Sequence, residues 1–97
     1  MSRRSIEPEI AGNPRVLDLC RAIAACSGDS LLLLAFLRDL LTPADLIACA
    51  NRWAATISVA EGKTIREEAG ELGIAEATVV RARQWAHSNT GGFAFAL

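Results

Sequence analysis

Apolar residues recur along this chain at the three- and four-residue spacing of α-helices, and no stretch alternates like a β-strand. The first helical stretch opens at Asn13-Pro14, because asparagine caps a helix and proline suits its first position. It runs to about Cys26 and ends at Ser27-Gly28. Its apolar stripe consists of Val16, Leu19, Cys20 and Ile23. Four further helices follow, so the pattern predicts an all-α fold of five helices.

The second predicted helix begins at Asp29 or Ser30 and reads L-L-L-L-A-F-L-R-D-L-L. It is apolar nearly all round, and a helix with that pattern is buried on every side. A chain of 97 residues forms only one small core, so a second subunit must supply the other side of this helix. We therefore expect an obligate homodimer.

The third predicted helix starts at Thr42-Pro43 and is the longest, reaching Glu61 before Gly62 ends it. Its apolar residues keep helical spacing over its whole length. Trp53 belongs to this stripe, so we expect it in the core; stacking on a cofactor is the alternative.

The segment from Thr64 to Gln84 predicts two short helices joined by a tight turn. Thr64 and Glu67 form a capping box, in which hydroxyl and carboxylate each accept from the other's amide. Gly73 stands where a left-handed residue must end the first helix, and Ala69 is small enough for a close helix crossing. This combination predicts a helix-turn-helix, against the alternative of two helices that merely meet at a glycine. Four residues are expected to face inward: Leu72, Ile74, Val79 and Ala82.

The two ends of the chain differ in character. Residues 1–12 carry Arg3 and Arg4 without periodicity, and we interpret them as a flexible arm, either a disordered leader or an arginine arm that touches phosphate. Residues 89–97 end in F-A-F-A-L, which we expect to dock because an exposed apolar tail would be sticky. We expect one domain over 13–97, with dimerisation helices at 13–62, the helix-turn-helix at 64–88 and the tail at 89–97.

Composition supports the expectation of an oligomer. The chain is 52% hydrophobic but only 5% aromatic, which is more aliphatic surface than so small a domain hides inside itself. Its net charge is −1, so any binding to a polyanion must depend on local charge. Three cysteines lie within apolar helical pattern without metal-like spacing, and we expect buried, reduced thiols: Cys20, Cys26 and Cys49.

Several function classes are disfavoured by what the sequence lacks. It contains no glycine-rich phosphate loop, metalloprotease motif or nucleophile elbow, so we expect neither an enzyme nor a metal site. The run Leu31–Leu37 is far shorter than the roughly 20 residues that cross a bilayer, and no signal peptide precedes it. We expect a cytoplasmic protein with His87 as an ordinary surface residue.

The spacing of these elements resembles the Trp repressor superfamily. A long helix closes on E-G-K-T, Gly73 follows Gly62 by eleven residues, and A-x-A-T-V-x-R comes next. The E-G-K-T entry and the glycine-aromatic tail look like the small YerC/YecD-type branch. The resemblance covers about Leu31–Leu97 and is strongest over Arg52–Arg83. It implies an intertwined homodimer that presents two helix-turn-helix heads to successive major grooves of double-stranded DNA, about 34 Å apart.

The resemblance also implies a site for an aromatic amino-acid corepressor. By position, Arg52 and Arg81 match the pair that sandwiches the corepressor's indole; the alternative is a structural or phosphate-contacting role. Trp85 replaces a small hydroxyl residue beside this site, and Ala82 replaces a glycine. Because Trp85 follows Arg81 by four residues, we expect its indole to stack on that guanidinium and to close the site without a cofactor. Phe93 or Phe95 would cover the remainder.

The DNA-reading positions depart partly from the family pattern. Ala75 lacks a capping hydroxyl, Glu76 adds a carboxylate near the duplex, and Glu68 takes a usually apolar, inward position. Over Glu61–Arg83, four positive charges oppose five negative ones. The positions expected at DNA are Arg66, Glu76, Ala77, Thr78, Val80, Arg81 and Arg83.

Two functions remain open on these residues. The leading hypothesis is a sequence-specific transcriptional regulator, a repressor, that binds DNA as a homodimer. The alternative is a protein-interaction module that keeps the dimer fold but has weak or lost DNA binding, as the acidic balance of the head favours.

Overall fold

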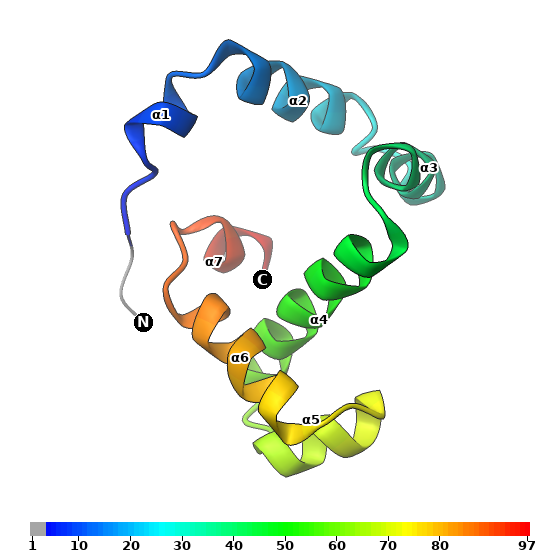
Figure 1. Cartoon of the computed structure of the whole chain (residues 1–97), viewed down its shortest axis with the longest axis vertical. Helices are drawn as coiled ribbons and strands as arrows, with labels where there is room; N and C mark the ends of the chain where they lie inside the picture. The colour runs from blue at the N-terminus through cyan, green and yellow to red at the C-terminus, as the bar shows by residue number, and fades with distance from the viewer. Residues whose placement is uncertain (1–3) are drawn as a thin grey trace. The chain divides into compact units, whose positions relative to one another are not determined.

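The computed structural model describes residues 4–97, and every regular element in this range is a helix (Figure 1). The prediction of an all-α protein is therefore confirmed for the described chain. The helices are α1 Pro8–Ala11, α2 Pro14–Ala25, α3 Ser30–Leu40, α4 Pro43–Ala60, α5 Ile65–Leu72, α6 Glu76–His87 and α7 Gly92–Ala96.

The five predicted helices correspond to α2 through α6, with ends that agree to within two residues. Side-chain caps explain this agreement. The Asn13 carboxamide oxygen accepts from the amide of Arg15 at 2.9 Å, and an Asp29 carboxylate oxygen accepts from that of Leu31 at 3.0 Å. The structure adds two short helices, α1 within the segment expected as an arm and α7 within the expected tail.

The chain divides into two compact units. One unit is Ser5–Leu46, with α1, α2 and α3; the other is Ile47–Leu97 together with Arg4. In the first unit α1 contacts α2, but neither α2 nor α3 contains a buried residue. Leu31 is 77% exposed and Leu32 is 54% exposed. The expected burial of this apolar helix on every side is therefore absent from the single chain.

The second unit has a core made largely of small residues. Ala55 and Val79 are fully buried, and the alanines of α5 and α6 at the helix crossing are nearly so. Val79 and Ala82 face inward as predicted, and Ile74 is half-buried. Leu72 differs from expectation because 40% of it is exposed, so it lies at the rim of the corner. Small side chains let α5 and α6 pack closely, and the two helices meet at one turn (Figure 1).

The turn between α5 and α6 has the predicted chemistry. Gly73 is left-handed, with φ 67° and ψ 34°, and the amides of Gly73 and Ile74 both donate to the carbonyl of Ala69. Ala75 begins α6 without a side-chain cap, as its methyl group requires. Only three residues separate α5 from α6, the length that is typical of a helix-turn-helix.

The tail docks through one aromatic residue. The Phe93 ring lies 5.8 Å from the Trp53 ring, centroid to centroid, and the planes are tilted by 58°. Trp53 is half-buried rather than fully enclosed, and Phe95 is 95% exposed. α7 therefore contacts α4 through one of its two phenylalanines.

The cysteines differ from the expected buried thiols. All three are free, but Cys20 and Cys49 are exposed and Cys26 is only half-buried. The reason is that α2 contains no buried residue and that α4 buries its second half rather than its first.

Two glycines of α5 and its cap give a matched test of this corner. Gly70 lies in mid-helix, and a Cβ built there meets no atom within 4 Å, so Gly70→Ala should raise the free energy of unfolding by about 0.5–1 kcal/mol. Gly73 has an equally open surrounding but a positive φ, so Gly73→Ala should lower it by about 1–2 kcal/mol. Urea denaturation measures both. Changes of the same sign would contradict the left-handed turn.

Candidate nucleic-acid interface

The predicted reading residues of α6 lie on its outward face. Val79 and Ala82 point into the core, which leaves the opposite side of the helix in solvent. Thr78 is half-buried and lies at the edge of this face. The exposed members of the set are Glu76, Ala77, Val80 and Arg81.

Two of these residues are held together by a hydrogen bond. The Arg81 guanidinium, through Nη2, donates to Thr78 Oγ1 at 3.4 Å, one helical turn away. Arg66 is exposed on α5 and points away from the core. The structure thus brings Thr78 and Arg81 together and leaves Arg66 on the neighbouring helix.

Arg83 differs from the other members of the predicted set. It lies four residues after the buried Val79, so its side chain turns inward and is only 20% exposed. Its Nε and Nη2 donate to one carboxylate oxygen of Glu68, at 3.3 and 3.1 Å, and Nη2 also donates to the Lys63 carbonyl at 2.8 Å. Because these two donors are engaged within the protein, Arg83 is less suited to a DNA contact than Arg66 or Arg81.

The partner of Glu68 is the feature that sequence reasoning missed. Glu68 was expected to point inward, and the structure buries it to 1% exposure. A buried carboxylate requires a cation, because desolvation of an unpaired charge is costly. Arg83 shares the inward face of α6 with Val79 and Ala86, at four- and three-residue spacing, and that spacing was the signal that could have found it.

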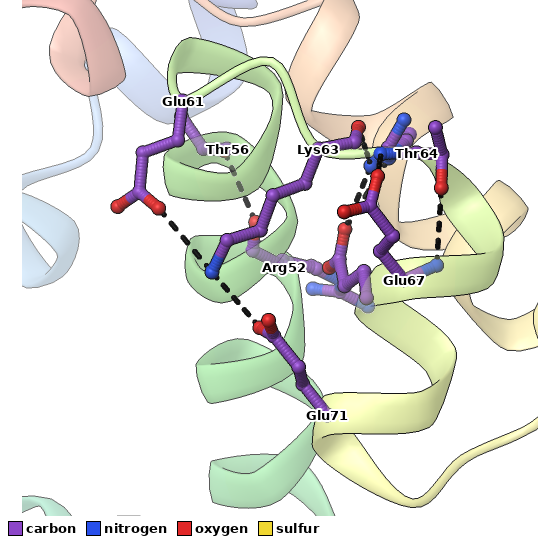
Figure 2. Close-up of polar contacts among 9 residues, drawn as sticks. Arg52, Thr56, Glu61, Lys63, Thr64, Glu67 and Glu71 are labelled. Atoms are coloured by element: carbon purple, nitrogen blue, oxygen red, sulfur yellow. Dashed lines mark hydrogen bonds and ion pairs between the residues drawn. The ribbon is translucent and has the colours of Figure 1, made fainter.

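Lys63 is also committed to local ion pairs. Figure 2 shows its ammonium group between two carboxylates, Glu71 at 2.8 Å and Glu61 at 3.3 Å. The hydrogen bonds to Glu71 and then to Glu61 raise the pKa of Lys63 above its ordinary value. Within residues 4–97, Arg66 and Arg81 are then the arginines of α5 and α6 with no carboxylate partner.

The capping box at the start of α5 is fully formed. The Glu67 amide donates to Thr64 Oγ1 at 3.1 Å, and the Thr64 amide donates to Glu67 Oε1 at 3.0 Å (Figure 2). The hydrogen bonds from the Thr64 backbone and then from its side chain lower the pKa of Glu67. The box fixes the direction in which α5 leaves the turn after α4.

The two arginines of the expected corepressor site are separated by the protein's own indole. The Arg52 guanidinium lies over the Trp85 ring, 4.7 Å from its centroid. This corrects the expectation that Arg81 would stack there, since Arg81 turns to Thr78 instead. Arg52 and Phe93 line one pocket of about 240 Å³, Arg81 lines another hollow, and Trp85 borders both. Phe95 is exposed and does not cover the site of the two arginines.

Two further properties concern metals and membranes. Within the described range, no three or more histidine, cysteine or acidic side chains gather as a metal site would require. None of the helices that the structure describes has the length and apolar character needed to cross a membrane.

Comparisons of the chain with protein-family models, with curated proteins and with solved structures find no match.

The capping box predicts a specific pH dependence. Because folding lowers the pKa of Glu67, its carboxylate stabilises the fold above the ordinary glutamate pKa of about 4.3, and this contribution is lost as pH falls through the folded value. Thr64→Ala removes the hydroxyl but keeps the backbone amide, which is the larger cause of the shift, so the Glu67 pKa should rise only part of the way toward its ordinary value, as measured by NMR titration of the carboxyl carbon. The lost cap should also cost about 1 kcal/mol at neutral pH.

Glu67→Gln is the matched control for this prediction. Glutamine keeps the acceptor of the capping box but does not titrate, so that variant should lose the Glu67 part of the acid dependence and keep the helix cap. An unchanged Glu67 titration in Thr64→Ala would contradict the role of Thr64.

Proposed function

We propose that this chain is a sequence-specific DNA-binding regulator of transcription, a repressor, that acts as a homodimer with a Trp-repressor-like fold. The observation that carries the proposal is the α5–turn–α6 corner. Its turn has three residues and a left-handed Gly73, its core side is sealed by Val79, and its outward face holds Thr78 and Arg81. These features support a helix-turn-helix, whose second helix would enter the major groove.

The outward side chains of α6 suit base edges. Arg81 can donate two hydrogen bonds to guanine, and Glu76 can accept from a cytosine amino group. The methyl groups of Ala77 and Val80 can contact a thymine methyl, and Thr78 offers a hydroxyl group to either kind of base pair. On α5, Arg66 has no carboxylate partner among the described residues and is suited to a phosphate.

The proposed dimer covers the apolar surface of residues 5–46. Leu31, Leu32 and Leu34 are each about half exposed or more in the single chain. Full burial of a leucine contributes about 1.5–3 kcal/mol, so an interface over α2 and α3 would gain substantial free energy. Two interlocked subunits would set the reading heads about one DNA turn apart, roughly 34 Å.

Sedimentation should show that the folded protein is a dimer. We expect analytical ultracentrifugation at micromolar concentration to give a single species of twice the chain mass. Leu31→Glu and Leu34→Glu together should dissociate it, because charges in a divided core are costly. Leu97→Glu, a substitution of an exposed leucine outside residues 5–46, is the control. A folded, monomeric wild type would contradict the proposal.

The salt dependence of DNA binding tests the proposed function. Arg66 of each head gives two phosphate contacts per dimer, and Arg81 brings the number to four where it contacts phosphate rather than guanine, so affinity should fall by about 10- to 100-fold between 50 and 200 mM salt. The assay uses fragments selected by the protein from random DNA. Weak binding that does not respond to salt would overturn the proposal.

Two variants refine this test of DNA binding. Thr78→Ala should weaken selected sites by roughly 1–3 kcal/mol while leaving non-specific binding nearly unchanged. Glu76→Gln should strengthen non-specific binding, because it removes a repulsion between the carboxylate and phosphate. If neither substitution changed the affinity for DNA, α6 would not read DNA.

A protein-interaction module is the second candidate function. It is favoured by the commitment of Lys63 and Arg83 to ion pairs and by the 95% exposure of Phe95. A discrete protein partner in pull-downs, with no enriched DNA, would support this candidate instead.

We further propose that DNA binding needs no aromatic amino acid as corepressor. The face of Arg52 that would stack on a free indole is taken by Trp85, at 4.7 Å. Calorimetry with free tryptophan should therefore give no heat of binding below about millimolar concentration, because Trp85 and a free indole would compete for the same face of the Arg52 guanidinium. A micromolar dissociation constant for the unmodified protein would contradict this prediction. Phenylalanine serves as the control ligand.

A further inference from the structure

The buried ion pair between Glu68 and Arg83 lies behind the outward face of α6, not on it. We propose that this pair positions α6 for sequence discrimination without touching DNA, and this inference rests on the proposed DNA-binding function. Glu68 belongs to α5 and Arg83 to α6, so the pair joins the two helices of the corner on their inner side.

The Arg83 side chain joins α6 to two other parts of the corner through three hydrogen bonds. It starts on α6, holds one carboxylate oxygen of α5 with two donors, and gives one of these donors also to the Lys63 carbonyl before α5. The guanidinium is planar and its donors have fixed directions, so the three contacts specify an orientation as well as a distance. The alanines Ala69 and Ala82 pack the crossing but have no such directional preference.

The carbonyl that Arg83 holds is itself well fixed. Lys63 is anchored through its ammonium group to Glu61 and Glu71, as Figure 2 shows, and the next residue, Thr64, caps α5. Arg83 therefore ties α6 to the point where α5 begins. A rotation of α6 about its axis would break these bonds.

The Glu68–Arg83 pair is poorly explained by a gain in the free energy of unfolding alone, and two observations argue against it. Removing both charges from water is costly, and an apolar pair of similar volume is often at least as stabilising. Glu68 is also only half-satisfied, because its Oε1 has no hydrogen-bond partner although it is buried. The ion pair thus fixes the rotation of α6 relative to α5, which apolar packing would not do.

The rotation of α6 controls where the reading residues lie. Thr78 and Arg81 lie on the same helix as Arg83, at most five residues away. A binding constellation works only if it is held within about 0.5 Å and 10–20° of its productive geometry. Release of the pair would let α6 rotate, which displaces Thr78 and Arg81 from base edges more than it disturbs flexible contacts to phosphate.

The test uses the double variant Glu68→Met with Arg83→Met, because either single change leaves a buried charge that endangers folding. In DNA binding we expect the salt slope, which is the change of log affinity with log salt concentration, to stay within about 0.5 of its wild-type value, and the non-specific affinity to stay within about twofold of wild type. The affinity ratio between selected and non-specific DNA should fall by about tenfold or more. The control is Asp18→Asn with Arg21→Gln, which removes an ion pair whose side chains are both 74% exposed in the single chain. Because these two residues lie on α2, sedimentation first checks that the control and the double variant have the oligomeric state of the wild type.

Two outcomes would overturn the inference. If the salt slope of the double variant were smaller than that of wild type by about two, Arg83 would contact one phosphate in each of the two heads. An unchanged affinity ratio would mean that the pair does not position α6 for reading.

Failure of the proposed function is recognised separately, because the wild type would then select no DNA. In that case hydrogen exchange still decides the positioning role. Amides of α6 should exchange about tenfold faster in the double variant while those of the second half of α4 stay unchanged. Equal exchange of α6 in both proteins would overturn it.

Discussion

The Glu68–Arg83 ion pair determines how the corner of α5 and α6 is held. Alanines bring the two helices close together, but their methyl groups bury little area and leave the rotation of each helix weakly specified. The guanidinium supplies the missing direction by joining α6 to a carboxylate of α5 and to the carbonyl of Lys63. Gly73 and the capping box of Thr64 then fix the two ends of α5, so that the corner of α5 and α6 is specified by local hydrogen bonds and one buried charge pair.

This internal use of charge shapes the proposed function. Arg83 and Lys63 neutralise acidic residues of the same segment, which leaves Arg66 and Arg81 without a carboxylate partner among residues 4–97. A head with two such cations gains limited electrostatic affinity, so DNA recognition would depend on the fit of α6 in the groove. A second head would double the contacts, which links the proposed DNA binding to the proposed dimer.

The packing of the unit formed by residues 5–46 also favours the proposed dimer. Its helices are well capped by Asn13 and Asp29, yet neither α2 nor α3 contains a fully buried residue in the single chain. Exposed leucines such as Leu31 and Leu40 are costly in water, and an interface between copies would remove that cost. The exposed Cys20 fits the same account, because it lies in an apolar pattern that the single chain does not cover.

The sequence by itself determined the all-α character and five of the helices. It also determined that α5 begins after Thr64 and ends before Gly73, because capping residues, proline and glycine act within a few residues. It also placed Val79 and Ala82 inside, through helical spacing. Only the tertiary structure decided which charges pair, since Arg83 and Glu68 are fifteen residues apart and their contact depends on how two helices cross. It likewise decided that Arg52, not Arg81, lies over Trp85, because spacing along α6 says nothing about the side chain that α4 brings to the same ring.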